Sequence, residues 1–352
     1  MKNSPRRSWQ QALFGDTEVE AILSPDADLQ RMLAVEAAWT RSLGQSSAVD
    51  KLQAEKVALA IENADIDYSQ LLEGSARDGI PVPSLVKQLQ SQLSDADNTL
   101  VHQGLTSQDV IDTALMLALQ QVLPVFHQRL QNIIATLNKL KERDGKRQVM
   151  AYTRMQAAHP IQSANRIDSW TRPLLLLAAQ SADMKKCCAM LQWGGPVGVR
   201  NQNLPAQTGA LFAAALGLHD PGHAWHSERQ VLADLAGHLS KLTNATGKLG
   251  QDIALQAQLA DGSLELENGG RSSAMPHKNN PVLAELLSTL ARINTGHLSL
   301  MHQALLHEQE RSGTAWMMEW QVLPHMLVTT GRSLLGTQSL LDQIKRLGKE
   351  DD

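Results

Sequence analysis

Apolar residues recur at helical spacing in the first hundred residues of the chain. Ser24 and Pro25 form a typical helix start. The apolar stripe that follows comprises Leu29, Met32, Leu33, Val35 and Ala37. Residues 51–64 and 83–93 show two further helical patterns. We therefore predict a helical N-terminal domain over residues 1–101.

Longer apolar stripes dominate the chain after residue 102. A first helix is expected directly after Thr106 or Ser107, with a bend at Pro124. Three later stripes keep close to the rhythm of about 3.5 residues that is typical of helices packed in a bundle. They comprise Val231, Leu235, Leu239, Leu242, Leu249 and Ile253; Leu283, Leu286, Leu287, Leu290 and Ile293; and Met317, Val322, Met326, Leu327, Leu334 and Leu335. The pattern predicts an all-α protein with a long-helix bundle over residues 102–345 and a polar tail over residues 346–352.

The composition favours helices and narrows the range of partners. Hydrophobic residues make up 43% of the 352 residues but aromatic residues only 3%, which favours helices over sheets. The net charge of −4 provides no global basic field for nucleic acid or anionic lipid. The N-terminus lacks the apolar core of a signal peptide, and no apolar run approaches the roughly 18 residues that span a membrane. We expect a cytoplasmic protein that binds a small anion in a local cationic pocket.

The stretch with the most candidate catalytic side chains is GGRSSAMPHKNNPVLAE, residues 269–285. Its glycine pair and its proline before an apolar run predict a mobile loop docked on a helix N-terminus, where an anion can bind. Ser272 or Ser273 can exchange a proton with carbon there, while Lys278 and Asn280 can hold the oxygens of an enediolate-like group. The alternative, from these residues alone, is a solvated Gly/Ser loop.

Two other segments carry polar groups suited to an anion. Thr106 and Ser107 either cap their helix or bind anion oxygens. Thr153 is followed by Arg154, whose permanently charged guanidinium suits an anion clamp or a structural salt bridge, but not proton transfer.

A histidine-rich segment follows at His219, His223 and His226. The Pro-Gly step at residues 221–222 interrupts any common helix face, and no cysteine or carboxylate completes a ligand set. No metal site is therefore predicted. Ser227 and Gln230 instead fit a capping box for the next helix.

Three motifs together resemble the fumarase/aspartase superfamily. SSAMPHKNNP is similar to its signature loop, GSSxMPxKxNP, and HQGLTSQDVIDTA, residues 102–114, is similar to its first signature. ERSGTAWMMEWQVLP, residues 310–324, resembles the tryptophan-containing segment of the 3-carboxy-cis,cis-muconate cycloisomerase branch. The likeness covers most of the chain.

The resemblance implies a homotetrameric, all-α enzyme whose sites combine segments from different subunits and need no metal or redox cofactor. It also implies lactonisation of 3-carboxy-cis,cis-muconate, or of its 3-sulfo analogue, in aromatic-compound catabolism. The catalytic residues implied by the matching motifs are Ser272, with Ser273 as its substitute, Lys278 and Glu285. The implied substrate-binding residues are His102, Thr106, Ser107, Gln108, Thr153, Arg154, Gln156, Arg271, Asn280 and Arg311.

The chain departs from the family pattern at several places. Arg271 stands where relatives have a small residue and Asn279 replaces a usual arginine, which leaves the 3-substituent open between carboxylate and sulfonate. Arg154 stands where many members have a histidine. An adenylosuccinate-type lyase and a non-catalytic structural protein of the same fold remain the alternatives. Relatives usually continue into a third, small helical domain, which we expect to be absent here.

Overall fold

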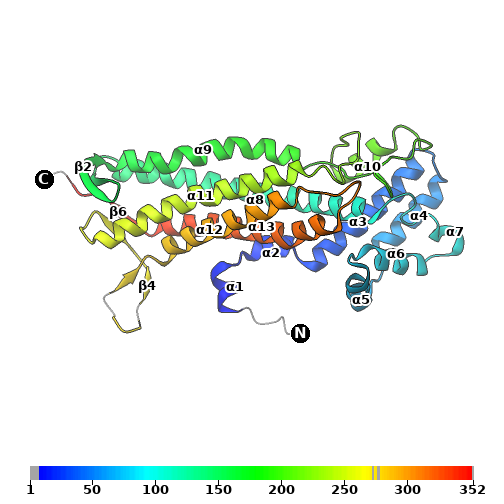
Figure 1. The fold of residues 1–352 in the computed structure, drawn as a ribbon, viewed down its shortest axis with the longest axis horizontal. Helices are drawn as coiled ribbons and strands as arrows, with labels where there is room; N and C mark the ends of the chain where they lie inside the picture. The colour runs from blue at the N-terminus through cyan, green and yellow to red at the C-terminus, as the bar shows by residue number, and fades with distance from the viewer. Residues whose placement is uncertain (1–7, 272, 276–277, 351–352) are drawn as a thin grey trace.

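Five long helices run along one another in the computed structural model, which describes residues 8–271, 273–275 and 278–350 (Figure 1). They are α8 (Ser107–Asp144), α9 (Ser163–Cys187), α11 (Gln230–Leu259), α12 (Val282–Gln303) and α13 (Gly313–Asp342). Their apolar stripes face inward and form one continuous core. The predicted all-α bundle is confirmed.

A smaller helical unit lies at one end of this bundle (Figure 1). Its core also draws on later parts of the chain, because α10 (Thr208–Leu216) packs on α3 and the rings of Trp193 and Phe212 lie 5.3 and 5.2 Å from that of Trp39. The N-terminal helices are α1 (Trp9–Phe14), α2 (Thr17–Ile22), α3 (Pro25–Gln45), α4 (Lys51–Glu62), α5 (Tyr68–Asp78), α6 (Val82–Ser91) and α7 (Asp95–Asn98).

Three short antiparallel strand pairs lie at the opposite end of the described structure (Figure 1). They are β1 (Gln148–Thr153) with β2 (Gln156–Gln162), β3 (Leu264–Leu266) with β6 (Ile344–Leu347), and β4 (Gly270–Arg271) with β5 (Asn279–Asn280). The predicted polar tail, residues 346–352, therefore begins inside a strand. Leu347 pairs with Leu264, and its side chain is buried in the core of the bundle. A four-residue strand is too short to show a clear period in the sequence.

Most of the predicted apolar stripes lie in the core. The stripe of α11 is buried at Leu235, Leu239, Leu242, Leu249 and Ile253, whereas Val231 is half-buried. The later stripes leave Ile293, Met317 and Leu335 exposed on the surface of the chain. The predicted capping box at residues 227–230 is wrong, because α11 follows Arg229 and no side chain caps it.

α8 connects the two ends of the molecule. Its 38 residues correspond to about 57 Å of helix. Pro124 lies inside the helix, as the sequence suggests. By length and composition α8 is apolar enough to cross a membrane, but 56% of that apolar stretch is buried within the protein. Core helices of soluble proteins pass the same test of length and composition.

α11 and α12 approach each other closely because α11 has glycines on the shared face. A Cβ atom added at Gly250 would lie 2.7 Å from the carbonyl oxygen of Ala284 and 2.8 Å from Cβ of Leu287. A Cβ atom at Gly247 would lie 2.5 Å from that of Ala291. Because interiors are close-packed, neither position can accept a methyl group without moving the helices apart.

We expect Gly250→Ala to lower the melting temperature and Gly237→Ala, on the same helix, to raise it. Overpacking typically costs about 1–3 kcal/mol, whereas replacing a helical glycine by alanine gains roughly 0.5–1 kcal/mol where space is open. A Cβ atom at Gly237 meets no described atom within 4 Å. Circular dichroism melts of the two variants test the difference, and equal rises in melting temperature would contradict the close packing.

Candidate active site

One buried carboxylate, that of Asp109, holds the first turn of α8 in place. It accepts hydrogen bonds from the amides of Thr106, Gly194 and Gly195 and lies against Nε2 of His226, at distances of 2.8 to 3.0 Å. Its side chain is completely buried. Three segments far apart in the sequence therefore meet at Asp109, which the motif match contained but which was not among the predicted site residues.

The predicted Thr-Ser pair begins α8. Thr106 is the N-cap residue, with an extended backbone, and Ser107 is the first residue of the helix. Unpaired amides and the helix dipole make such a position attractive to anions. Two left-handed residues, His102 (φ 59°) and Gly104 (φ 78°), shape the turn that leads into it. Thr106 also forms a capping box with Asp109, so the pair lies where a helix begins.

Gln108 and Arg311 lie beside this turn and contact each other. Nε of Arg311 donates to Oε1 of Gln108 at 3.0 Å, and Nη2 of Arg311 donates to the carbonyl of Pro196 at 3.1 Å. The amide of Gln108 donates to the carbonyl of His226 at 2.9 Å. Gln108 is completely buried, so in this structure it supports Arg311 and does not face open space.

A buried ionic network joins α8 to α11 and α13. Arg229 lies between Asp112, whose Oδ2 is 2.6 Å from Nη1, and Glu319, whose Oε2 is 2.5 Å from Nη2. The indole of Trp316 also donates to Asp112, at 3.1 Å. All three charged side chains are at least 97% buried. Sequence reasoning missed this network, although Asp112 and Glu319 both lie in segments that resemble the family.

Thr153, Arg154 and Gln156 lie at the far end of the bundle. They form the tip of the β1–β2 hairpin, where Arg154 and Met155 take up left-handed backbone angles and all the side chains are exposed. The full length of α8, about 57 Å, separates this hairpin from Thr106. The structure therefore does not bring the two predicted segments together within one chain.

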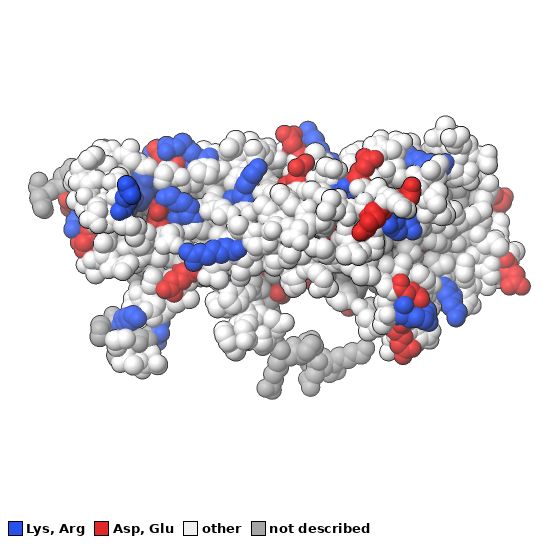
Figure 2. Space-filling view, in the orientation of Figure 1, with Lys and Arg blue, Asp and Glu red and all other residues white. Residues whose placement is uncertain are grey.

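The signature loop lies at that same far end, where β4 and β5 project from the bundle (Figure 1). Arg271, Ser273 and Lys278 are exposed, Asn280 is half-buried, and Glu285 is exposed in the first turn of α12. Figure 2 shows cationic atoms on this projection. Ser272 lies outside the described residues.

The loop follows the C-terminus of α11, whose N-terminus is next to Asp109 through His226. The 30 residues of α11 place the loop about 45 Å from the Thr-Ser pair. The predicted site residues thus form two groups, one at each end of the bundle.

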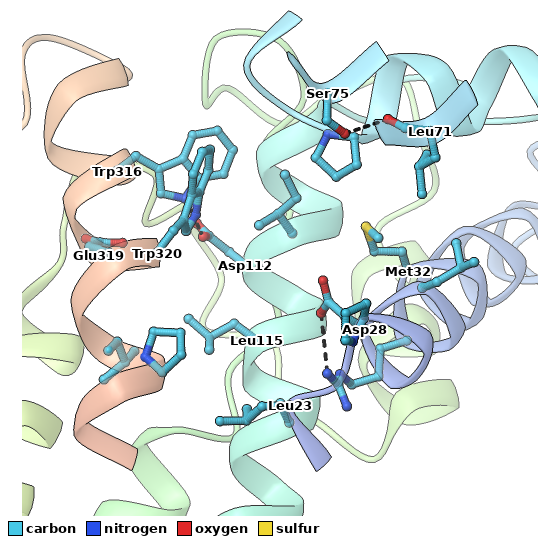
Figure 3. Close-up of a pocket in the computed structure, with 18 of the residues that line it drawn as sticks. Leu23, Asp28, Met32, Leu71, Ser75, Asp112, Leu115, Trp316, Glu319 and Trp320 are labelled. Atoms are coloured by element: carbon cyan, nitrogen blue, oxygen red, sulfur yellow. Dashed lines mark hydrogen bonds and ion pairs between the residues drawn. The ribbon is translucent and has the colours of Figure 1, made fainter. Parts of the chain in front are cut away.

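A cavity lies elsewhere, between the N-terminal helices and α13 (Figure 3). It encloses about 430 Å³, and its walls are mainly apolar. Trp316 and Trp320, with ring centroids 4.6 Å apart, form one side, and Leu23, Met32 and Leu115 line others. None of the predicted site residues lines it. The cavity is therefore distinct from both groups of polar residues.

Two histidines of the His-rich segment, His223 and His226, have different surroundings. His226 faces Asp109, whereas Nε2 of His223 lies 3.7 Å from Glu228 on the surface. Within residues 8–271, 273–275 and 278–350, no three His, Cys, Asp or Glu side chains gather as a metal-ligand set.

The long-helix bundle, with the Thr-Ser pair at a helix start and the Lys-Asn loop before another helix, is the architecture of lyases of the fumarase/aspartase superfamily. Residues 35–294 match the Lyase family, and the chain belongs to it. The predicted resemblance is confirmed, and with it the enzyme class of lyases and cycloisomerases.

Individual relatives of known activity show which members of the family the chain resembles. The chain is 30% identical to 3-carboxy-cis,cis-muconate cycloisomerase of Pseudomonas aeruginosa over 98% of its own length and 77% of the relative. It is 29% identical to nitrosuccinate lyase of Streptomyces davaonensis over 90% of this chain and 70% of the relative. The crystal structure of 3-carboxy-cis,cis-muconate lactonizing enzyme from Pseudomonas putida superposes with a TM-score of 0.89 at 27% identity, over 97% of this chain and 77% of that one.

We expect Arg229→Met to destabilise the fold strongly. The substitution leaves the carboxylates of Asp112 and Glu319 buried without their cation, and breaking a buried pair in this way typically costs about 3–5 kcal/mol. Lys141→Met is the matched control, because the Lys141–Asp168 pair is exposed and such pairs contribute roughly 0–1 kcal/mol. Urea unfolding measures both, and equal small losses would show that the network is not a structural joint.

Proposed function

We propose that the protein lactonises 3-carboxy-cis,cis-muconate, or its 3-sulfo analogue, in the catabolism of aromatic compounds. The observation that carries the proposal is the pairing of two motifs on one fold: a Thr-Ser helix start suited to a carboxylate, and a Ser-Lys-Asn loop suited to a developing negative charge. The similarity to a muconate cycloisomerase over 98% of the chain supports the same substrate class.

The reaction is an isomerisation of the acid: closing the ring from an ionised carboxylate adds one proton to carbon, and Ser272, which gives that proton, regains one from solvent. A substrate carboxylate oxygen adds to one carbon of the double bond, and the pair of electrons moves toward the neighbouring carboxylate. Lys278 and Asn280 stabilise this aci-carboxylate, and the hydroxyl of Ser272 delivers a proton to the adjacent carbon. Thr106, Ser107 and the start of α8 bind a carboxylate that does not react. Arg271 and Arg311 supply further positive charge, and no step requires a metal or redox cofactor.

The distance between the two groups of residues leads us to propose a homotetramer with shared sites. Within one chain, about 45 Å of α11 separates the Lys-Asn loop from the Thr-Ser pair. Packed helices cannot shorten that distance, so the loop of one copy has to meet the helix start of another. The exposed apolar residues Ile293, Met317 and Leu335 on the bundle are suited to contacts between copies.

Ser272→Ala should reduce turnover by about 100-fold to 10,000-fold, because a positioned proton donor contributes on that order. Ser273→Ala should reduce it less. The measurement is the loss of ultraviolet absorbance of the muconate chromophore, run in parallel on the 3-carboxy and 3-sulfo substrates.

Adenylosuccinate, assayed with the same preparations, tests the alternative lyase activity. Wild-type turnover by a folded Ser272→Ala protein would remove this serine from the mechanism. Absence of turnover of all three compounds by the wild-type protein would favour a non-catalytic role.

Shared sites predict complementation between inactive variants. Lys278→Ala lacks the loop cation and Ser107→Ala lacks the hydroxyl at the helix start, so each protein alone should turn over muconate slowly. Co-expressed in one cell, the two chains form mixed assemblies in which some sites are intact, and activity should exceed that of either parent.

The matched control is a single chain that carries both substitutions, expressed alone, so that every site lacks both groups. Sedimentation of the wild-type protein reports the assembly directly. A stable, fully active monomer would overturn the shared-site arrangement.

A further inference from the structure

Glu36 is a carboxylate buried in the middle of α3, within the core of the N-terminal unit. Its side chain is completely removed from solvent. Its Oε1 atom lies 2.6 Å from Nδ1 of His102, and no described residue bonds its second oxygen, Oε2. Burying a carboxylate is unfavourable unless it is paired, so His102 is the partner that makes this burial possible.

The backbone at His102 is held in an uncommon conformation. Its φ of 59° lies in the left-handed region, which residues other than glycine seldom adopt. Two contacts from α3 hold this turn: Glu36 contacts the ring of His102, and the indole of Trp39 donates to the carbonyl of Gln103 at 2.8 Å. The turn leads directly into the Thr-Ser pair at the start of α8. A conformation that its surroundings impose at such a place points to a functional purpose.

We propose that Glu36 is a positioning residue: it holds His102 with the proton on Nδ1 and leaves Nε2 as a cationic donor for a substrate carboxylate. This inference rests on the proposed function, because it takes the start of α8 to be the carboxylate site. The side chain of His102 is 18% exposed, and no described residue forms a hydrogen bond with Nε2. A bond from Nδ1–H to a carboxylate fixes both the tautomer and the orientation of an imidazole.

The charges around His102 favour its cationic form. Burial by itself lowers the pKa of His102, but the hydrogen bond and negative charge of Glu36, together with the charge of Asp109 on α8, raise it above its ordinary value. These two carboxylates are the charged groups that act on the ring among the described residues. The imidazolium therefore persists to higher pH than in an unfolded chain, next to a helix N-terminus that also attracts anions.

The nearby His226 provides a contrast. It too faces a carboxylate, that of Asp109, but its side chain is only 3% exposed and its Nδ1 atom is buried without a partner in the described structure. His226 is thus a buried structural residue, whereas the partly exposed side chain of His102 can contact a ligand.

The first test needs no substrate. Ring-nitrogen NMR on the full-length protein follows the pKa and tautomer of His102, identified among the 12 histidines by the resonances that disappear in His102→Gln. Glu36→Gln, which keeps the shape and removes the charge, should lower the pKa of His102 by about one unit or more and let the ring populate both tautomers.

Trp39→Phe is the matched control, because it removes the other contact from α3 without changing the charge near the ring. It should leave the pKa and tautomer unchanged. An unchanged pKa in folded Glu36→Gln, or an equal shift in Trp39→Phe, would overturn the proposal.

The second test uses muconate turnover. At a pH that lies between the pKa of His102 in Glu36→Gln and its pKa in the wild-type protein, only the variant has a neutral imidazole. In this pH range the KM of the variant should rise by roughly tenfold or more, while its kcat changes less, because a charge-assisted contact is lost. At a pH below both values the two KM values should converge. A KM ratio that is independent of pH would overturn the binding role of His102.

Failure of the wild-type protein to turn over muconate counts against the proposed function and leaves the NMR result standing.

A third measurement tests the Glu36–His102 pair even if the Glu36→Gln variant does not fold. Because the pKa of His102 is raised in the folded state, the pair stabilises the protein fully below the unfolded pKa, and this contribution disappears as the pH rises through the folded value. The difference in melting temperature between wild type and His102→Gln should therefore be larger at about pH 5.5 than at about pH 9. The reverse order, or no dependence on pH, would overturn the pairing.

Discussion

The pairing of Arg229 with Asp112 and Glu319 is the constraint on which the arrangement of the helices depends. A buried charge left without its partner is strongly unfavourable, so α8 and α13 have to present their carboxylates to the residue just before α11. Asp112 lies three residues after Asp109, so the two carboxylates lie close together on α8. The register of the bundle and the shape of the Thr-Ser turn are therefore fixed by one stretch of one helix.

The same rigidity explains why a single chain holds two separate groups of site residues. α8 and α11 have tightly packed neighbours, and the glycines of α11 bring α12 so close that even a methyl group does not fit. Neither helix can bend enough to bring the signature loop to the Thr-Ser pair. Under the proposed function, the long helices serve as spacers, and only another copy of the chain supplies what each end lacks.

Sequence reasoning was most reliable where the signal is local. The period of α11 identified five core leucine and isoleucine positions, and the Ser24-Pro25 start of α3 was found by its capping chemistry. The prediction of a polar tail from residue 346 was wrong at its start, because β6 depends on pairing with β3, some 80 residues earlier. Such pairing leaves no periodic pattern in four residues. Arg229 and Glu36 were missed for a related reason. Their partners are 66 to 117 residues away, and a charged residue in a helical stripe looks like a solvated one until its partner is placed.

Besides Arg229, two buried carboxylates organise the end of the bundle that we propose to bind an anion. Glu36 and Asp109 are both completely buried, and each faces an imidazole. A chain with a net charge of −4 has no positive field of its own to attract an anion, so positive charge has to be created locally. At His102, the buried carboxylate of Glu36 does this by raising the pKa of the imidazole, and Glu36 is itself kept from the substrate by burial. Because Glu36 and His102 come from α3 and from the turn before α8, the packing of the N-terminal unit against the bundle sets the charge at the start of α8.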